Sequence, residues 1–214
     1  MTRPPFAPPT EADIAAVSEQ LGRPARDVVG IAARCVCGAP TVVSTRPRLA
    51  DGTPFPTFYY LTHPAATAAV STLEAEGEMP RLAALLGVPL GVPLEGAAPM
   101  GEPSELLERA ESAPPTQLAA NPERAANAQS APPTVAAQYH AAHGSYIADR
   151  DTFGSVPEIA GISAGGMPDR VKCLHSLVGH ALAAGAGVNP IGDLALERSS
   201  WDPSVCECAK VLSW

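Results

Sequence analysis

The sequence predicts an α+β fold, in which a small antiparallel sheet of about three strands packs against about four or five helices. Short segments rich in β-branched and aromatic residues gather between residues 27 and 61, which indicates the sheet. Segments with helical spacing and capping residues lie on both sides of that region. A low-complexity insertion, dominated by proline, alanine and glycine, interrupts the helical segments at residues 87–133.

The domain organisation follows from the same composition. We expect one α+β domain, built from residues 11–86 and 134–198. The proline-rich residues 1–10 are expected to be disordered, and the Pro/Ala-rich residues 87–133 to lack a core of their own. Residues 199–214 are predicted to form an irregular C-terminal tail.

The first part of the chain supplies the beginning of the sheet. Thr10 precedes a predicted helix over residues 11–21, and Asp13 stands at the N3 position of a capping box. Two strands follow at residues 27–33 and 40–45. Because the link between them is short and contains glycine, the two strands are predicted to form a hairpin.

A third strand, at residues 57–61, leads into the helical part of the chain. Its aromatic and β-branched residues favour the same sheet, and prolines are confined to its entry. The helices are predicted at residues 64–75, 79–86, 135–150 and 168–184, with a last one that ends near residue 198.

The stretch between residues 163 and 193 concentrates glycine, both signs of charge, cysteine and histidine. Gly165 and Gly166 favour a tight turn, and Pro168 suits the first turn of the helix that follows. Such a turn, with Arg170 and Lys172 close behind it, is a candidate binding site for a phosphate or carboxylate group.

Four further residues of this stretch are candidate catalytic groups. If the helix is regular from Pro168, then Asp169, Cys173 and His180 lie on one polar stripe, and His175 points away from it. Cys173 and His175 are then not a chelating pair. Near a helix N-terminus the Cys173 thiol would have a lowered pKa and would suit a nucleophile.

The sequence contains two Cys-x-Cys pairs, one inside the predicted domain and one in the tail. Cys35 and Cys37 lie at the hairpin tip, in a Cys-x-Cys-Gly sequence similar to a zinc knuckle. Cys206 and Cys208 lie in the tail, and the sequence leaves open whether they join a metal site. His63 stands where the third strand passes to a helix, a place that suits a helix cap or a site residue.

Composition narrows the classes of function. A net charge of −8 and a pI near 5.1 argue against broad nucleic-acid binding. The start of the chain has no signal-peptide core and no apolar run is long enough to span a membrane, so we expect a cytoplasmic protein. In that reducing compartment the five cysteines are expected to be thiols or metal ligands. The excess of arginine, alanine and proline indicates a GC-rich bacterial genome.

Several blocks of the sequence are distinctive when taken together. They are residues 51–64 (DGTPFPTFYYLTHP), Ala142–His143 with Tyr146, residues 165–175 (GGMPDRVKCLH), and residues 187–190 (GVNP) with Gly192–Asp193. In these blocks the chain resembles a bacterial family known as domain-of-unknown-function family 501. The resemblance covers nearly the whole chain apart from residues 1–10, the insertion and the tail, and it confers no activity.

The resemblance implies a set of candidate site residues. They are Cys35, His63, His143, Asp169, Arg170, Lys172, Cys173, His175 and His180. The family has histidine or cysteine at the position of His63, an exchange that is natural for a metal ligand. The resemblance therefore implies that Cys35, His63 and Cys173 converge on one zinc ion, with His175 as the fourth ligand, or with His180 or His143 in its place.

Three functions remain open on the sequence. The leading one is a zinc site that joins the hairpin tip to the central helix, closed and structural, or open and hydrolytic. The second is a metal-free enzyme in which Cys173 is the nucleophile and His63 or His180 the base. The third is an anion-binding regulatory or scaffold module, whose partner is a phosphorylated small molecule or a protein and whose site is the glycine turn with Arg170 and Lys172.

Overall fold

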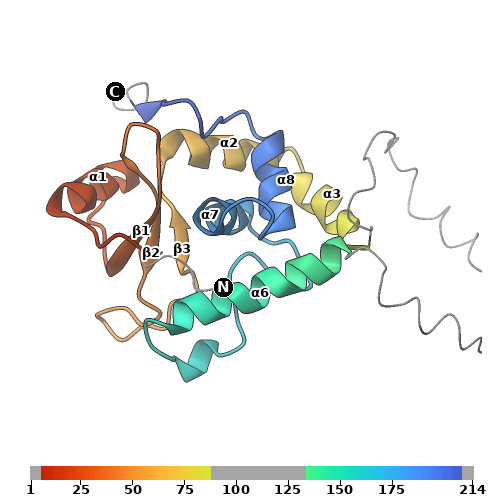
Figure 1. Cartoon of the computed structure of the whole chain (residues 1–214), viewed down its shortest axis with the longest axis horizontal. Helices are drawn as coiled ribbons and strands as arrows, with labels where there is room; N and C mark the ends of the chain where they lie inside the picture. Colours follow the sequence, from red (N-terminus) through yellow and green to blue (C-terminus); the bar gives the residue numbers. More distant parts are fainter. Residues whose placement is uncertain (1–5, 88–133, 209–214) are drawn as a thin grey trace, which may run out of the picture. The chain divides into compact units, whose positions relative to one another are not determined.

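The computed structural model describes residues 6–87 and 134–208, and they form an antiparallel three-stranded sheet and six α-helices (Figure 1). The predicted α+β fold is therefore confirmed. The strands are β1 (Val28–Arg34), β2 (Pro40–Thr45) and β3 (Tyr59–Leu61). The helices are α1 (Glu11–Leu21), α2 (Pro64–Ala75), α3 (Glu78–Ala84), α6 (Val135–Asp151), α7 (Leu174–Ala184) and α8 (Pro190–Arg198).

The sheet has the order β1-β2-β3, with β2 in the middle. Val28 pairs with Thr45 at the open end of the predicted hairpin, and Val42 pairs with Leu61 on the other side of β2. Every residue of β2 is buried, because this strand has a neighbour on each edge and helices on both faces.

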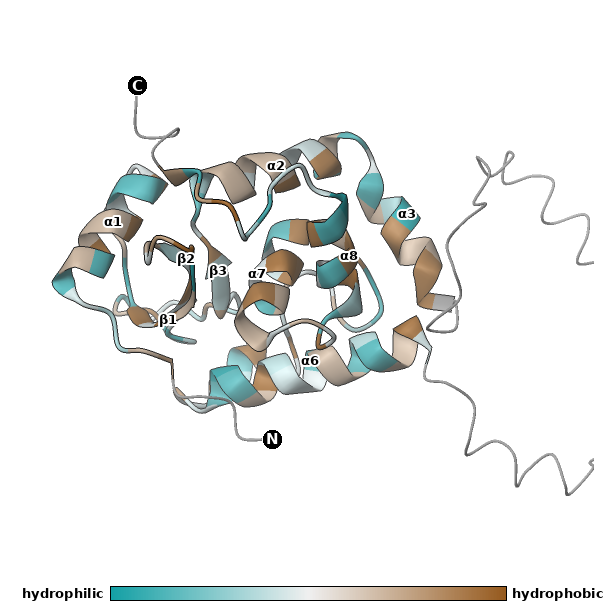
Figure 2. Ribbon diagram, turned by 45° about the horizontal axis from the view of Figure 1, so that its top comes forward, coloured by the Kyte–Doolittle hydropathy of each residue, from teal (hydrophilic) through white to brown (hydrophobic). Residues whose placement is uncertain are grey.

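The helices cover the two faces of the sheet unequally. Helix α1 lies on one face, where Val17 packs with Ile31 and Val43. Helix α7 lies against the other face, and α2, α6 and α8 surround it (Figure 1). In Figure 2 the surrounding helices alternate between hydrophobic and hydrophilic residues along their length, as expected for helices with one buried face.

Helix α7 is the centre of the core. A Cβ atom at Gly192 of α8 would lie 2.2 Å from the carbonyl oxygen of Leu177, so only glycine allows α8 to approach α7 so closely. On the sheet side, the ring of His180 stacks on the ring of Tyr59 with a centroid distance of 5.3 Å. The position of α7 is thus fixed from both sides by direct packing.

The structure corrects the predicted start of this central helix. The sequence predicts a start at Pro168, but α7 begins at Leu174. Before it, the Lys172 N–H donates to the carbonyl oxygen of Gly165 at 2.8 Å, which closes the glycine turn on itself. The Leu174 N–H, the first of the helix, donates to the carboxylate of Glu74 at 2.6 Å. A side chain distant in the sequence therefore caps α7, and the residues before Leu174 form a loop.

The described part of the predicted N-terminal segment 1–10 begins at Phe6, and Ala7 forms an isolated β-bridge with Ile31 of β1. The Ile31 N–H donates to the Ala7 carbonyl oxygen at 2.9 Å, and the Phe6 ring lies 5.9 Å from that of Phe58. Three ranges lie outside the described residues: residues 1–5, residues 88–133 of the predicted insertion 87–133, and residues 209–214 of the predicted tail. Within the described part, no helix has the length and apolar character that crossing a membrane requires.

Candidate functional site

The β1–β2 hairpin tip presents two cysteines on a defined turn. Cys35 follows the end of β1, and its N–H donates to the Ala39 carbonyl oxygen at 2.8 Å. The Gly38 N–H donates back to the Cys35 carbonyl oxygen at 2.8 Å, and Gly38 has a φ of 91°, which side chains disfavour. The Cys-x-Cys-Gly sequence therefore sets the direction of both thiols.

Arg34 ties this turn to helix α1. Its guanidinium donates to both carboxylate oxygens of Asp13, at 2.6 and 3.0 Å, and also to the Gly38 carbonyl oxygen at 2.8 Å. Asp13 belongs to the predicted capping box with Thr10, which the structure confirms. Hydrogen bonding from Arg34 holds the pKa of the Asp13 carboxyl well below its usual range. The turn is thus anchored to α1 by side-chain hydrogen bonds.

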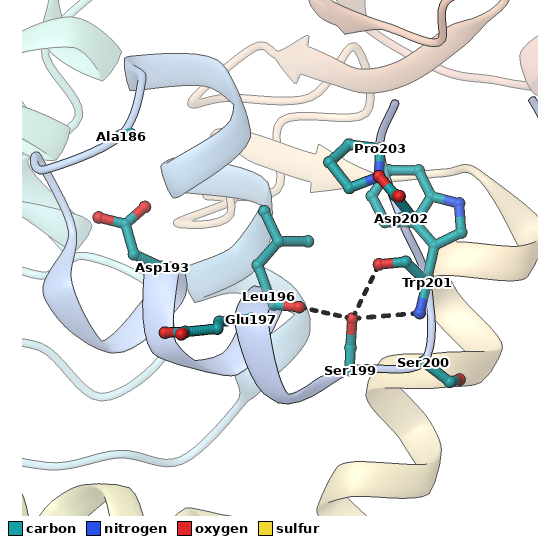
Figure 3. Close-up of a pocket in the computed structure, with 9 residues that line it drawn as sticks. All are labelled: Ala186, Asp193, Leu196, Glu197, Ser199, Ser200, Trp201, Asp202 and Pro203. Carbon is teal, nitrogen blue, oxygen red and sulfur yellow. Dashed lines mark hydrogen bonds between the residues drawn. The ribbon is translucent and has the colours of Figure 1, made fainter. Parts of the chain in front are cut away.

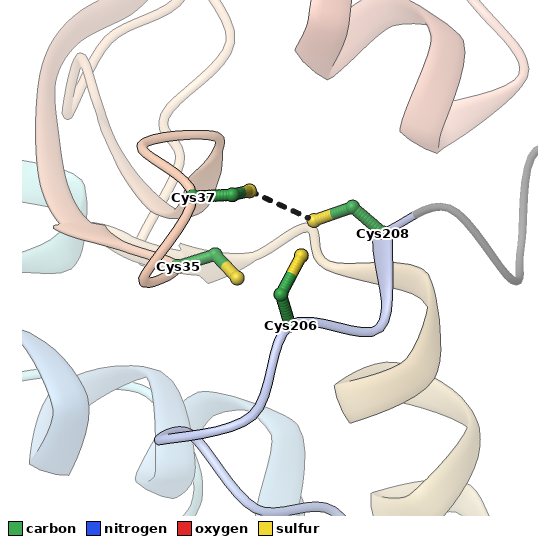
Figure 4. A group of neighbouring side chains, drawn as sticks. All are labelled: Cys35, Cys37, Cys206 and Cys208. Atoms are coloured by element: carbon green, nitrogen blue, oxygen red, sulfur yellow. Dashed lines mark hydrogen bonds between the residues drawn. The ribbon is translucent and has the colours of Figure 1, made fainter.

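The C-terminal segment brings two more cysteines to the same place. Trp201 is buried, and Asp202 then closes a turn by accepting from the Ser204 N–H at 2.8 Å. In Figure 4 the thiols of the tail and of the hairpin tip point toward a common centre. The ligand atoms of the whole group lie within 4.8 Å of one another, and the group consists of Cys35, Cys37, Cys206 and Cys208.

The spacing of these sulfur atoms fits a metal site better than a disulfide. Cys37 Sγ lies 3.5 Å from Cys208 Sγ, and all five cysteines are free thiols. A disulfide requires about 2.05 Å. Two sulfurs bound to one tetrahedral zinc at about 2.3 Å each lie about 3.8 Å apart. The four-cysteine group is therefore compatible with metal binding.

The thiols of this group differ in acidity. Hydrogen bonding from the Ala39 backbone, helped by contacts with Cys208 and Cys206, lowers the pKa of Cys37 to about 7. Burial raises the pKa of the Cys35 thiol and, more strongly, that of Cys208. The Cys37 thiol therefore ionises more readily than the thiols of Cys35 and Cys208.

His63 lies beside the four-cysteine group. It is fully buried as the N-cap of α2, with its ring centroid 5.4 Å from that of Trp201. Its Nδ1 accepts from the Ala66 N–H at 3.5 Å, and its Nε2 lies 3.3 Å from Cys208 Sγ. Since Nδ1 accepts, Nε2 carries the proton and donates to the sulfur. Burial lowers the pKa of His63, in keeping with a neutral ring.

The predicted zinc ligands do not form one group. Cys35 belongs to the four-cysteine group and His63 lies beside that group, whereas Cys173 and His175 lie at the start of α7 together with Glu74 of α2. The prediction that Cys173 and His175 point apart is wrong, because α7 begins between them, at Leu174, and the loop leaves Cys173 free to turn toward His175.

The second ligand group has a hydrogen-bond partner for each member. Its ligand atoms lie within 4.8 Å of one another, and His175 Nδ1 lies 3.2 Å from Glu74 Oε1. His175 Nε2 lies 3.2 Å from the Thr67 carbonyl oxygen, and the Ser176 hydroxyl donates to Cys173 Sγ at 3.6 Å. Hydrogen bonding to Cys173 raises the pKa of His175. Burial raises the pKa of Cys173, but hydrogen bonds with His175 and Ser176 outweigh it and the shift is downward.

The remaining predicted residues lie apart from both groups. Asp169, Arg170 and Lys172 are exposed on the loop before α7, where Glu74 already occupies the helix N-terminus. His180 is fully buried in the core, and Asn189 Nδ2 lies 3.2 Å from its Nδ1.

The other histidine implied by the family resemblance also has a local partner. His143 Nδ1 lies 2.8 Å from the Ser163 hydroxyl oxygen. Neither ligand group found in residues 6–87 and 134–208 includes His143 or His180.

Sequence reasoning missed Glu74 and left the tail cysteines undecided. Glu74 is one of several acidic residues near the end of α2, and only the folded structure brings it to α7. The repeated Cys-x-Cys spacing of the hairpin and the tail was the available signal for their pairing.

A surface hollow of about 550 Å³ lies at the end of α8. Figure 3 shows Asp193, Glu197 and Asp202 around it, with the Ser199 hydroxyl bridging Leu196 and Trp201. The Asp193 carboxylate accepts from the Gly187 N–H at 2.8 Å. No member of either ligand group is among the described residues that line this hollow.

Comparison with known proteins gives a family and no activity. The sequence model of a family described as "Protein of unknown function (DUF501)" matches residues 31–88 and 122–197. The match includes the hairpin tip and all three residues of the second ligand group, and it ends before Cys206 and Cys208. No curated protein and no solved structure matches the chain.

Proposed function

The chain belongs to this family of unknown function, and we propose that it is a zinc-binding protein in which the four-cysteine group holds a structural ion. In this proposal the ion joins the β1–β2 hairpin tip to the C-terminal segment. This replaces the predicted link from the hairpin tip to the central helix. The observation that carries the proposal is the convergence of four thiols from two distant segments within 4.8 Å.

A structural role is favoured by the number of ligands and by the surroundings. Four thiolates complete the tetrahedral shell of zinc and leave no position for water or substrate. The hollow beside His63 and Cys208 has a volume of about 70 Å³. That hollow is much smaller than the surface hollow of about 550 Å³ at the end of α8.

Zinc is the favoured ion because of the donors. A soft shell of four sulfurs selects zinc or iron over the hard cations that prefer oxygen. His63 then donates its Nε2–H to the Cys208 thiolate, and such hydrogen bonds orient ligands and reduce their charge. We place the protein in the cytoplasm, where free thiols remain reduced and available to a metal.

The test is metal analysis of the full chain, purified without a tag or added metal. The Cys37→Ser and Cys206→Ser variants, one from each segment, are each expected to lose one equivalent of zinc. Ser204→Ala, a change in the same tail that removes no thiol, is the control and is expected to keep it. Full zinc content in both cysteine variants would contradict the proposal.

A further inference from the structure

The second ligand group points to another site. We propose that Glu74, Cys173 and His175 bind a second divalent cation of the zinc class, in a site that keeps one coordination position open. This inference goes beyond the structural zinc proposed above and does not depend on it, because the two groups share no residue.

The geometry of the three donors suits one ion. Nitrogen and oxygen ligands of tetrahedral zinc at about 2.0–2.2 Å lie about 3.4 Å apart, and His175 Nδ1 and Glu74 Oε1 are 3.2 Å apart. Thiolate, imidazole and carboxylate are all zinc ligands. The group also combines two donors that are anionic when deprotonated with one neutral ring, which balances the charge of a divalent ion.

The partners of His175 show which of its nitrogens is available. Nε2 lies 3.2 Å from the Thr67 carbonyl oxygen and 3.1 Å from the Ser71 hydroxyl oxygen. A carbonyl oxygen only accepts hydrogen bonds and a hydroxyl oxygen can accept them, so a proton on Nε2 suits both contacts. Nδ1 then faces Glu74 Oε1 with its lone pair. Two acceptors approach this closely only with a proton or a cation between them. A proton on Nδ1 serves that one pair, whereas a metal ion also serves the Cys173 sulfur.

The supporting hydrogen bonds resemble those of metal sites in general. Metal-bound histidines commonly donate their other ring N–H to a backbone carbonyl, and metal-bound carboxylates are themselves hydrogen-bonded. Here the Thr67 carbonyl oxygen accepts from His175, and the Leu174 N–H donates to Glu74. Helices α2 and α7 therefore hold the donors in place before an ion binds.

The site is accessible from solvent and incomplete. The side chains of His175 and Glu74 are 26% and 25% exposed, and Cys173 is half-buried, so an ion and a water molecule can reach them. Three protein ligands with water in the fourth position are the arrangement of catalytic zinc, which lowers the pKa of that water to about 7. The exposed Arg170 and Lys172 on the adjoining loop favour a small anion as the exchangeable ligand.

The experiment is a metal count on the full chain and on variants of each group. The wild-type protein is expected to contain about two zinc equivalents, the number that two independent sites require. Cys173→Ser and Glu74→Gln are each expected to retain one. Glu76→Gln, which removes an exposed carboxylate just after α2, is the control and should retain both. Glu74→Gln keeps a carbonyl oxygen that can accept from the Leu174 N–H, so the cap of α7 is retained. This variant therefore still tests the site if Cys173→Ser misfolds.

Cobalt substitution tests the open position. In cobalt-loaded Cys37→Ser protein, which retains the three-ligand site alone, added azide is expected to shift the visible absorption spectrum. In cobalt-loaded Cys173→Ser protein, which retains the four-cysteine site, azide should have no effect. An unchanged metal content in both Cys173→Ser and Glu74→Gln would overturn the proposal. A second combination of results would also overturn it: one metal per wild-type chain, the same metal content in Cys173→Ser, and rapid alkylation of Cys173 by iodoacetamide. That combination would indicate that Cys173 is a metal-free thiol.

Discussion

The two ligand groups differ in what holds their residues together. The four-cysteine group joins a hairpin tip to a terminal segment, and the Trp201 ring of that segment packs on the His63 ring at the start of α2. The group of Glu74, Cys173 and His175 lies between two helices of the core, where packing already fixes both partners. An ion at the first site would therefore connect two segments of the chain, whereas an ion at the second would bind where helix packing already places the donors.

The largest expected effect follows from removing the ion of the four-cysteine site. Binding to the folded state alone stabilises by about 4 kcal/mol when free zinc is a thousandfold above its Kd. For a chain of this size that corresponds to a fall in Tm of roughly 10 °C in Cys206→Ser. Differential scanning calorimetry of wild type and variant, each with and without a chelator, measures it.

The same calorimetric measurement on Cys173→Ser separates the two sites. We expect a clearly smaller fall in Tm, because helix packing and not metal holds that site. An equal fall in both variants would contradict the distinction between a structural and a preformed site.

His63 provides the next largest effect. His63→Phe keeps an aromatic ring opposite Trp201 and removes the donor to Cys208. Loss of such a hydrogen bond typically weakens metal affinity about 10- to 100-fold. Competition with a chromophoric chelator measures the affinity, and His140→Phe, on the exposed side of α6, serves as the control.

Arg34 is expected to affect zinc affinity indirectly, because it holds the backbone of the hairpin turn that carries Cys35 and Cys37. In Arg34→Lys the bidentate pairing with Asp13 and the contact with the Gly38 carbonyl oxygen cannot be made together. We expect a severalfold loss of zinc affinity at the four-cysteine site and none at the three-ligand site. The same chelator competition, made in the Cys173→Ser and Cys37→Ser backgrounds, separates the two effects.

The smallest effect concerns pH. Because Arg34 lowers the pKa of Asp13 in the folded state, the stability that this pair contributes is complete above the ordinary carboxyl pKa of about 4. It is lost as the pH falls below that value, since protonation then favours the unfolded chain. Urea unfolding of metal-free protein between pH 7 and pH 3 should show a steeper loss in wild type than in Asp13→Asn. Parallel curves would contradict the assigned role.

Local signals in the sequence predicted most of the fold. The capping box of Thr10 and Asp13, the hairpin and the helix over residues 64–75 depend on neighbours in the chain, and the structure contains them. The start of α7 was mispredicted because Pro168 and Asp169 are local helix signals, whereas the cap that decides it comes from Glu74.

The candidate site was less predictable for the same reason. Cys37 and Cys208 meet across 171 positions in the sequence, and spacing alone does not say which thiols pair. A helix that begins at Pro168 would point the side chains of Cys173 and His175 in different directions. Because α7 begins at Leu174, Cys173 lies outside the helix and that constraint does not apply.

We propose that four sulfurs bind one zinc ion at the junction of the hairpin tip and the tail. X-ray absorption at the zinc edge of the Cys173→Ser variant tests it most directly, because the three-ligand site is disabled there. The predicted result is a shell of about four sulfur ligands at about 2.3 Å with no nitrogen or oxygen. A shell dominated by nitrogen and oxygen ligands, or no bound zinc, would contradict the account.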